Sequence, residues 1–361
     1  MPVDTPGTPH DARLEELCAW IALGHRRDTW TIAPASADAS FRRYFRISFD
    51  NGTTLVAMDA PPEREDCHPF VQVAGLLHEA GLNAPQVVQA NLERGFLLLT
   101  DLGRQTFLAA MTADGVGDST ADSTADSTDP AAYARADALY GAAITALVQW
   151  QYASRSHVLP PYDAALLRRE LDLFPQWYLG EHLGIAAEPG LQTMLEPVFA
   201  LLIASALAQP RVWVHRDYMP RNLMISTPNP GILDFQDAVE GPITYDLASL
   251  FKDAFISWPE ARVIDWTIRY WEQARKAGLP VDADFGEFYR AFEWMGLQRH
   301  LKVLGIFARL QHRDGKPDYL RDAPRFHGYI RSVARRYNGF GGLAALLDRI
   351  EARETRSGFT F

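Results

Sequence analysis

The 361-residue chain is poor in cysteine and has no excess of basic charge. Cys18 and Cys67 lie far apart without a metal-ligand spacing, so neither a disulfide framework nor a zinc site is predicted, and a reducing, cytoplasmic location is favoured. With 35 basic and 45 acidic side chains, the formal charge of −10 argues against a broad electrostatic surface for nucleic acid or anionic membrane. We therefore expect small-molecule partners.

The chain also lacks a long apolar run and a secretory signal. Its longest apolar stretch, residues 198–208, is far shorter than a membrane span. Residues 1–10 are rich in proline and threonine and have neither a charged start nor an apolar run. Because 47% of the residues are hydrophobic, a sizeable core is expected, in two ordinary domains or one large two-lobed unit.

Residues 112–130 form a low-complexity tract in which an Asp-Ser-Thr-Ala unit is followed by two near-copies. Small polar and acidic side chains bury too little apolar surface to offset the entropy of ordering. We therefore predict a disordered surface insertion that takes no part in the site. A regulatory phosphorylation tract is the alternative interpretation.

Before this tract the pattern predicts a short helix and then a small sheet with one helix. The hairpin signal is the strongest, because Asn51-Gly52 separates two β-rich runs and both residues tolerate positive φ. Those runs are residues 43–49 and 53–58. The other elements expected here are strands at residues 86–90 and 96–100 and a helix across residues 70–77 that ends at Gly81.

Beyond the tract, apolar residues recur with helical spacing, which predicts a mainly helical region. One short β-rich patch, residues 211–235, interrupts it, and the polar side chains able to carry chemistry concentrate there. The helical segments are expected near residues 131–153, 164–182, 191–208, 244–256, 259–277 and 285–311.

Within the patch, residues 212–214 are predicted to form a hairpin with residues 222–225, and the turn carries Asp217 and Asn222. Phosphoryl transfer needs a carboxylate that orients the attacking hydroxyl and accepts its proton, and it needs oxygen ligands for magnesium. Asp217 suits the first requirement and Asn222 the second. A buried strand that ends near Asp234 brings a second carboxylate. The plain alternative is that these are turn and cap residues.

Residues 215–222 resemble the catalytic loop of protein kinases, and Asp234-Phe235 resembles their metal loop. The similarity to the aminoglycoside phosphotransferase superfamily is closer, because the two motifs lie close together and no activation loop is found. This resemblance implies an α+β, two-lobed protein-kinase-like fold, with a small antiparallel β-rich N-lobe and a larger, mainly helical C-lobe. It also implies ATP and Mg²⁺ as cofactors.

By the same resemblance, Asp217 is the catalytic base, and Asn222 and Asp234 hold magnesium. His215 is structural, and Asp246 accepts backbone N–H bonds from the catalytic loop. The expected N-terminal nucleotide-binding lobe covers residues 1–103 with a hinge near residues 98–103, and the catalytic and substrate lobe covers residues 104–361.

The nucleotide-binding half departs from the kinase pattern. The expected phosphate-covering turn, residues 37–41, has no glycine, and Asp59 stands where kinases have a phosphate-binding Lys. Ser40 and Arg43 are the candidate phosphate contacts, with Arg43 as the hypothetical replacement for the Lys. The alternative for Arg43 is a solvated strand face. Adenine is expected to bind backbone groups in the hinge, at Thr100, Asp101 and Leu102.

Four further segments, residues 39–46, 58–63, 234–238 and 298–305, carry a narrower resemblance. They are similar to the bacterial anomeric sugar kinases of cell-wall recycling, the N-acetylmuramate/N-acetylglucosamine kinases, in which Asp59 is ordinary. The resemblance implies transfer of the γ-phosphoryl group of ATP to the C1 hydroxyl of an N-acetylated amino sugar, giving an α-1-phosphate for peptidoglycan recycling. We expect a monomer with an amino-sugar substrate and neither nucleic-acid nor membrane partners.

A sugar acceptor needs polar groups for its hydroxyls and an aromatic face for its ring. Trp177 is the aromatic candidate, although such a residue more often belongs to the core. Glu170 is a polar candidate, with a solvated helix face as the alternative. The lactyl carboxylate of muramate needs a cation, for which the candidates are Arg299, His300 and Lys302.

Two other functions stay open. A kinase for an aminoglycoside or choline has the same catalytic residues but calls for a denser acidic and aromatic lining than the helical region offers. A pseudokinase, which binds without turnover, is favoured by the missing Lys and glycines. Retention of Asp217, Asn222 and Asp234 together argues against it.

Overall fold

A computed structural model of the chain describes residues 11–25, 28–36, 41–116, 129–185, 188 and 190–357, with side-chain surroundings as far as residue 352. The chain divides into two compact units. The first consists of Met1–Glu79 with Asn83–Gly103, and the second of Ala80–Leu82 with Arg104–Phe361.

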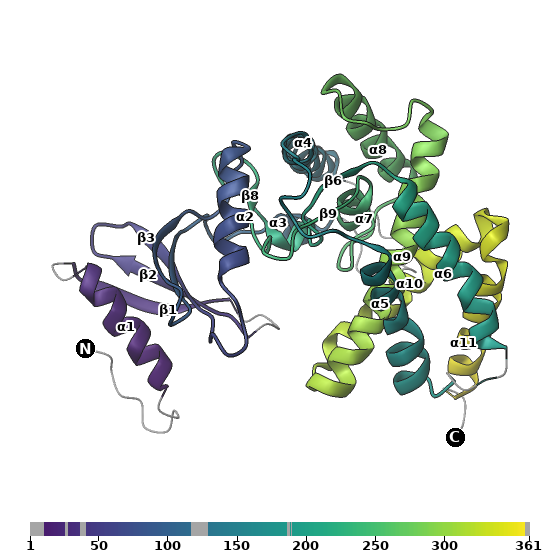
Figure 1. Ribbon diagram of the computed structural model, residues 1–361, viewed down its shortest axis with the longest axis horizontal. Coiled ribbons are helices and arrows are strands. Elements are labelled where there is room, and N and C mark those ends of the chain that lie inside the picture. The colour runs from purple at the N-terminus through teal and green to yellow at the C-terminus, as the bar shows by residue number, and fades with distance from the viewer. Residues whose placement is uncertain are drawn as a thin grey trace. The chain divides into compact units, whose positions relative to one another are not determined.

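The first unit is built on a five-stranded antiparallel sheet in the order β1-β2-β3-β5-β4, of which β1, β2 and β3 are labelled in Figure 1. Helix α1 (Ala12–Gly24) begins at Asp11, whose carboxylate accepts the N–H of Leu14 at 3.0 Å. Apolar residues of α1, among them Leu17 and Ile21, pack with Phe96 and Leu98 of the sheet. The remaining elements are β1 (Trp30–Ser36), β2 (Arg43–Phe49), β3 (Thr54–Asp59), α2 (His68–Glu79), β4 (Val87–Asn91) and β5 (Phe96–Thr100).

The predicted hairpin is confirmed. Strands β2 and β3 pair with Arg43 opposite Asp59 and Ser48 opposite Thr54, and Gly52 in the turn has φ +85°. In β5 the residues from Phe96 to Leu99 are all buried, so side chains on both faces of this strand are covered. Strands β1 and β5 flank this hairpin, so β2 and β3 are interior strands of the sheet.

The second unit is mainly helical. Its core includes apolar residues of α9 (Phe285–Asp314), which packs against α5, α6, α7 and α10. The sequence prediction ended at residue 311 and missed the helices that follow it. The other elements are α3 (Phe107–Ala113), α4 (Pro130–Tyr152), α5 (Ala164–Leu173), a π-helical segment (Phe174–His182), α6 (Leu191–Ala208), α7 (Tyr245–Phe251), α8 (Glu260–Lys276), short 3₁₀ segments at Pro317–Asp322 and Asn338–Phe340, α10 (Ala323–Arg336) and α11 (Gly341–Ser357).

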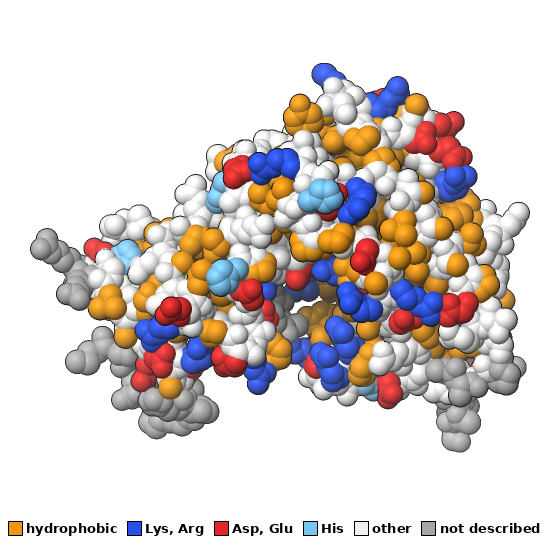
Figure 2. All heavy atoms as spheres, in the orientation of Figure 1, with side chains coloured by type: hydrophobic (Ala, Val, Ile, Leu, Met, Phe, Trp, Pro, Cys, Tyr) orange, Lys and Arg blue, Asp and Glu red, His pale blue; other side chains and the backbone are white. Residues whose placement is uncertain are grey.

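Helix α6 is longer than the apolar stretch that the sequence pattern singled out. In length and composition it is the one helix in the described residues apolar enough to cross a membrane. Leu195, Phe199 and Leu202 lie on one side of it and are buried in the helical core. Over the face seen in Figure 2, basic and acidic side chains are interspersed.

Short strands interrupt the helices, and their pairing differs from the prediction. Strand β6 (Arg211–Val214) pairs with β9 (Val239–Pro242), while β7 (Leu223–Met224) pairs with β8 (Gly231–Ile232). The predicted hairpin between residues 212–214 and 222–225 is therefore wrong. The residues between β6 and β7 form a loop that ends in a 3₁₀ turn, Pro220–Asn222.

A five-stranded antiparallel sheet followed by a mainly helical region confirms the predicted fold class. Within the low-complexity tract, Thr112 and Ala113 end α3, Val116 is buried, and Asp129 caps α4. Residues 117–128 of the predicted insertion lie outside the described residues.

Candidate active site

Asn222 brings the predicted catalytic and metal loops together in the second unit. Its side-chain amide donates to the backbone oxygen of Asp217 at 2.9 Å and to Oδ2 of Asp234 at 3.2 Å. The backbone N–H of Leu233 donates to the backbone oxygen of Asn222 at 2.9 Å. The three residues on which the phosphotransferase prediction depends are therefore neighbours, and their individual roles stay predictions.

Asp234 has a left-handed backbone conformation, with φ +63°. An L-residue adopts this region only at some cost in strain, which the surrounding contacts must offset. Gln236 donates to Oδ1 of Asp234 at 3.0 Å, while Asn222 donates to Oδ2. Two amide groups therefore orient this carboxylate.

Asp246, at the start of α7, binds the backbone of the catalytic loop. Its two carboxylate oxygens accept the backbone N–H groups of His215 at 2.7 Å and Arg216 at 2.9 Å. Asp246 is fully buried, and burial raises its pKa to about 7, although the two N–H donors favour the ionised form. These contacts are the kind of support that the sequence predicted for Asp246.

His215 is also buried, and its Nδ1 accepts the backbone N–H of Asp217 at 3.3 Å. Burial lowers the pKa of His215 to about 4, and the nearby Asp217 opposes that shift only in part. His215 is therefore neutral near pH 7, as an acceptor for the Asp217 N–H must be.

This burial predicts a pH effect on stability. Because the folded pKa of His215 lies below its unfolded value, the unfolded chain takes up the proton first on acidification, and stability is lost as the pH falls from about 6.5 towards 4. Between about pH 6.5 and about pH 4.5, the wild type should lose about 2 kcal/mol more unfolding free energy than His215→Asn, whose amide keeps an acceptor. Urea unfolding at both pH values measures the difference.

The raised pKa of Asp246 acts in the opposite direction, since its ionisation lowers stability as the pH rises from about 4 to 7. That effect is present in both proteins and largely cancels in the comparison. Equal pH dependence of the wild type and His215→Asn would contradict the assignment of a neutral, buried His215.

The residues present fit a magnesium ion that is shared with phosphates. Asn222 and Asp234 are adjacent, and both offer the oxygen ligands that Mg²⁺ prefers. In the described part of the chain no group of three His, Cys, Asp or Glu residues could hold a metal by itself. Magnesium bound with a nucleotide commonly has only one or two protein ligands, so the pair is sufficient.

The candidate sugar contacts lie largely inside the second unit. Lys302 forms an ion pair with Glu170 at 2.9 Å, and His300 stacks on Tyr329 with ring centroids 4.7 Å apart. Arg299 is only 2% exposed, and Trp177 packs against the helical core. The sugar-binding role of these five side chains stays a prediction.

Sequence reasoning assigned no role to three residues that contact Glu170. Arg216 donates to its Oε1 at 2.6 Å, Gln298 donates to its Oε2 at 3.2 Å, and Tyr162 donates to the same Oε2. Arg216 carried a signal, because it stands beside Asp217 in the loop motif. Gln298 opens the segment 298–305 that carried the narrower resemblance, but no role was assigned to it. Tyr162 comes from a distant segment that no local pattern marks.

In the first unit, Asp59 is a fully buried carboxylate between two arginines. Arg13 donates to Oδ1 from Nε at 2.9 Å, and Arg43 donates to Oδ2 from Nε at 2.9 Å. Arg43 also forms an ion pair with Asp11. Asp59 thus links α1 to the sheet, which explains how a carboxylate is accommodated where kinases have a Lys.

The other predicted nucleotide contacts lie in or next to β5. Arg46 binds both carboxylate oxygens of Asp101, at 2.6 and 3.0 Å, and donates to the backbone oxygen of Gly103 at 2.6 Å. Thr100 accepts the N–H of Gln86 at 2.9 Å, and the Leu102 side chain is half-buried. Ser40 lies outside the described residues.

The hypothesis that Arg43 binds phosphate can be separated from its support of Asp59. If it holds, Arg43→Ala should raise the KM for ATP about tenfold, since a charged hydrogen bond contributes about 1.5–3 kcal/mol. Arg13→Ala is the matched control, because it removes the other guanidinium from the same carboxylate. Equal effects of both variants on the KM for ATP would show that Arg43 acts only through Asp59.

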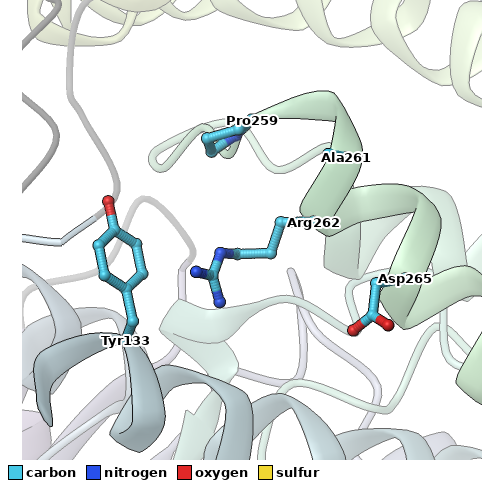
Figure 3. A pocket seen from close by; sticks show the side chains of 5 residues that line it. All are labelled: Tyr133, Pro259, Ala261, Arg262 and Asp265. Carbon is cyan, nitrogen blue, oxygen red and sulfur yellow. The ribbon is translucent and has the colours of Figure 1, made fainter. Parts of the chain in front are cut away.

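A surface pocket between α4 and α8 is separate from the residues described above. It has a volume of about 380 Å³. Tyr133 of α4 and residues at the N-terminal end of α8, among them Arg262, line it (Figure 3). The guanidinium of Arg262 lies 4.3 Å from the ring centroid of Tyr133 and donates to Asp137 at 3.0 Å. None of the five lining residues belongs to the catalytic or metal loop.

The fold and the paired loops define a class of small-molecule phosphotransferases. Residues 31–285 match the phosphotransferase enzyme family. The choline kinase LicA of Streptococcus pneumoniae superposes with a TM-score of 0.58 at 12% identity, covering 89% of this chain and 100% of that chain. The ADP-bound aminoglycoside phosphotransferase APH(2'')-Ib gives a TM-score of 0.55 at 12% identity, with 88% and 97% covered. These two likenesses show the fold.

A closer similarity identifies the branch. An N-acetylmuramate/N-acetylglucosamine kinase of Pseudomonas aeruginosa is 52% identical over 347 residues, which cover 93% of this chain and 96% of the relative. The chain therefore belongs to the phosphotransferase enzyme family and, within it, to the N-acetylmuramate/N-acetylglucosamine kinases. The family recognised from the sequence segments is confirmed.

Proposed function

We propose that this chain is a kinase that transfers the γ-phosphoryl group of ATP to the C1 hydroxyl of N-acetylmuramate or N-acetylglucosamine and forms the α-1-phosphate. The observation that carries the proposal is the bridge from the Asn222 amide to Asp217 and Asp234. The 52% identity to a kinase named for these two sugars supports the acceptor.

Asp217 would act on the acceptor hydroxyl. Phosphoryl transfer requires little covalent chemistry from the protein, so a carboxylate that orients the hydroxyl and accepts its proton supplies the main chemical contribution. Asp217 is only half-buried, so its carboxylate has room to meet a substrate. The backbone contacts of His215, Asn222 and Asp246 fix the loop from which it projects.

Asn222 and Asp234 would hold Mg²⁺. When bound, the ion would neutralise charge on the phosphates. The two amide donors to Asp234, from Asn222 and Gln236, hold the carboxylate in one orientation without cancelling its charge. This arrangement keeps a localised negative charge next to the amide of Asn222.

ATP is the proposed phosphoryl donor, and the family match supports a nucleotide in general. The first unit would bind it through backbone groups of β5 and the residues that follow, near Thr100 and Leu102. Both cysteines, Cys18 and Cys67, are free, which supports the further proposal of a reducing, cytoplasmic location. A monomeric enzyme is also proposed.

A direct assay tests the proposal. The protein is incubated with ATP, Mg²⁺ and a panel of N-acetylmuramate, N-acetylglucosamine, an aminoglycoside and choline, and phosphorus NMR locates the new phosphate. Phosphate on C1 of an amino sugar is the expected product. If only choline or only the aminoglycoside is phosphorylated, the proposed amino-sugar acceptor is wrong and that compound takes its place. Tight nucleotide binding without any turnover would indicate a pseudokinase.

A further inference from the structure

A buried carboxylate next to the catalytic loop has every acceptor position filled. Oε1 of Glu170, in α5, accepts from Arg216 at 2.6 Å and from Lys302 at 2.9 Å. Its Oε2 accepts from Gln298 at 3.2 Å and from Tyr162. A carboxylate has about four lone-pair sites, so four donors leave none for a sugar hydroxyl.

Arg216, which contacts Glu170, is the residue directly before Asp217 in the chain. Arg216 has a left-handed backbone, with φ +76°. Such a conformation persists in a non-glycine residue only when surrounding contacts hold it. Asp246 holds the backbone N–H of Arg216, and Glu170 holds its guanidinium, so this residue is fixed at both ends.

Charge makes this attachment strong. Glu170 is ionised, because Lys302 and Arg216 outweigh the effect of burial and lower its pKa to about 2. Lys302 also donates to the hydroxyl of Tyr245 at 2.9 Å, so Lys302 has a second partner besides Glu170. Hydrogen bonds between ionised partners are shorter and stronger than neutral ones.

We propose that Glu170 is a positioning residue that acts through Arg216 to hold the backbone of the catalytic loop, so that Asp217 meets the acceptor hydroxyl in one orientation. This inference rests on the proposed function and replaces direct sugar contact as the role of Glu170. Two observations support it. Four donors occupy the oxygens of Glu170, and one of these donors is Arg216, whose backbone is in the left-handed conformation.

The test compares Glu170→Gln, the double variant Glu170→Gln with Lys302→Met, and a control. The first leaves Arg216 without its carboxylate and two buried cations without their shared anion. The second also removes one of those cations, which should restore the melting temperature, but Arg216 still faces a neutral amide instead of a carboxylate. The control, Glu196→Gln, alters a carboxylate that pairs with Arg168 of α5 at the surface.

In both Glu170 variants kcat should fall about 100-fold, which is the loss expected when a catalytic group is displaced by about 1 Å. The KM for ATP should change by less than about threefold. In Glu170→Gln the KM for the sugar should also change by less than about threefold. The control should retain wild-type kcat. Recovery of kcat together with melting temperature in the double variant would show a merely structural role and overturn the proposal. A raised sugar KM with unchanged kcat in Glu170→Gln would overturn it in favour of sugar contact.

Hydrogen exchange gives a readout that is independent of turnover. Backbone amides at residues 216–219 should exchange at least about tenfold faster in both Glu170 variants than in the wild type and Glu196→Gln, since local opening becomes easier. Unchanged exchange would overturn the positioning role even in an active kinase. A wild type that phosphorylates no amino sugar would instead overturn the proposed function, and the exchange result would still decide whether Glu170 holds the loop.

Discussion

Asp217→Asn is expected to lower kcat by about 10²- to 10⁴-fold, the range for loss of a positioned general base. An amide keeps the shape of the side chain and can still contact a hydroxyl, but it cannot accept the proton. The backbone contacts from Asn222 and His215 do not involve the replaced carboxylate, so the loop should keep its conformation. Steady-state kinetics with saturating amino sugar, with ADP release as the signal, measures the effect.

Two controls make this result specific. Nucleotide affinity and melting temperature should stay close to the wild-type values in Asp217→Asn. Asp172→Asn changes a surface carboxylate that pairs with Arg168 and should leave kcat unaltered. An Asp217→Asn enzyme with more than about a tenth of wild-type kcat would remove Asp217 from the role of base and leave the reaction without its main chemical group.

Asp246→Ala is expected to have the largest effect on stability. The substitution leaves the backbone N–H groups of His215 and Arg216 buried without their acceptor, at about 1–3 kcal/mol each, or about 2–6 kcal/mol together. The catalytic loop also loses its two hydrogen bonds to α7, so kcat should fall as well. Urea unfolding gives the free energy, and kinetics well below the melting temperature gives kcat.

Asp246→Asn is the graded comparison. It keeps the volume and one acceptor oxygen, so it should lose about half as much unfolding free energy as Asp246→Ala, about 1–3 kcal/mol. The order of the two variants is the decisive quantity. If the alanine variant is as stable as the asparagine variant, the two N–H bonds contribute little, and the loop is held by other contacts.

Local chemistry explains which parts of the fold were predictable. The β2–β3 hairpin was predicted correctly because Asn51 and Gly52 specify a tight turn and the two strands need no other partner to be recognised. The pairing of β6 was predicted wrongly, because a strand of four residues does not identify its partner. β9 lies beyond two short strands along the chain, and only tertiary packing selects it.

The site divides in the same way. Asp217, Asn222 and Asp234 were identified because catalytic and metal chemistry require particular residue types at a short spacing within one loop region. Glu170 was predicted as a sugar contact, and its neighbours in sequence, Arg168 and Arg169, suggested the alternative of a helix face in solvent. That alternative is wrong, because the Glu170 side chain is buried. Its observed partners come from three separate segments, at Tyr162, Arg216 and Gln298.

The sequence by itself determined the class of chemistry, the family and the succession of a β-rich and a helical region, because these depend on residue types, spacing and hydrophobic periodicity along a short stretch of chain. The tertiary structure alone decided which strand completes each small sheet, which arginines neutralise Asp59, and which donors fill the oxygens of Glu170. Those outcomes depend on burial, since a charge removed from water must find its partners wherever the folded chain brings them.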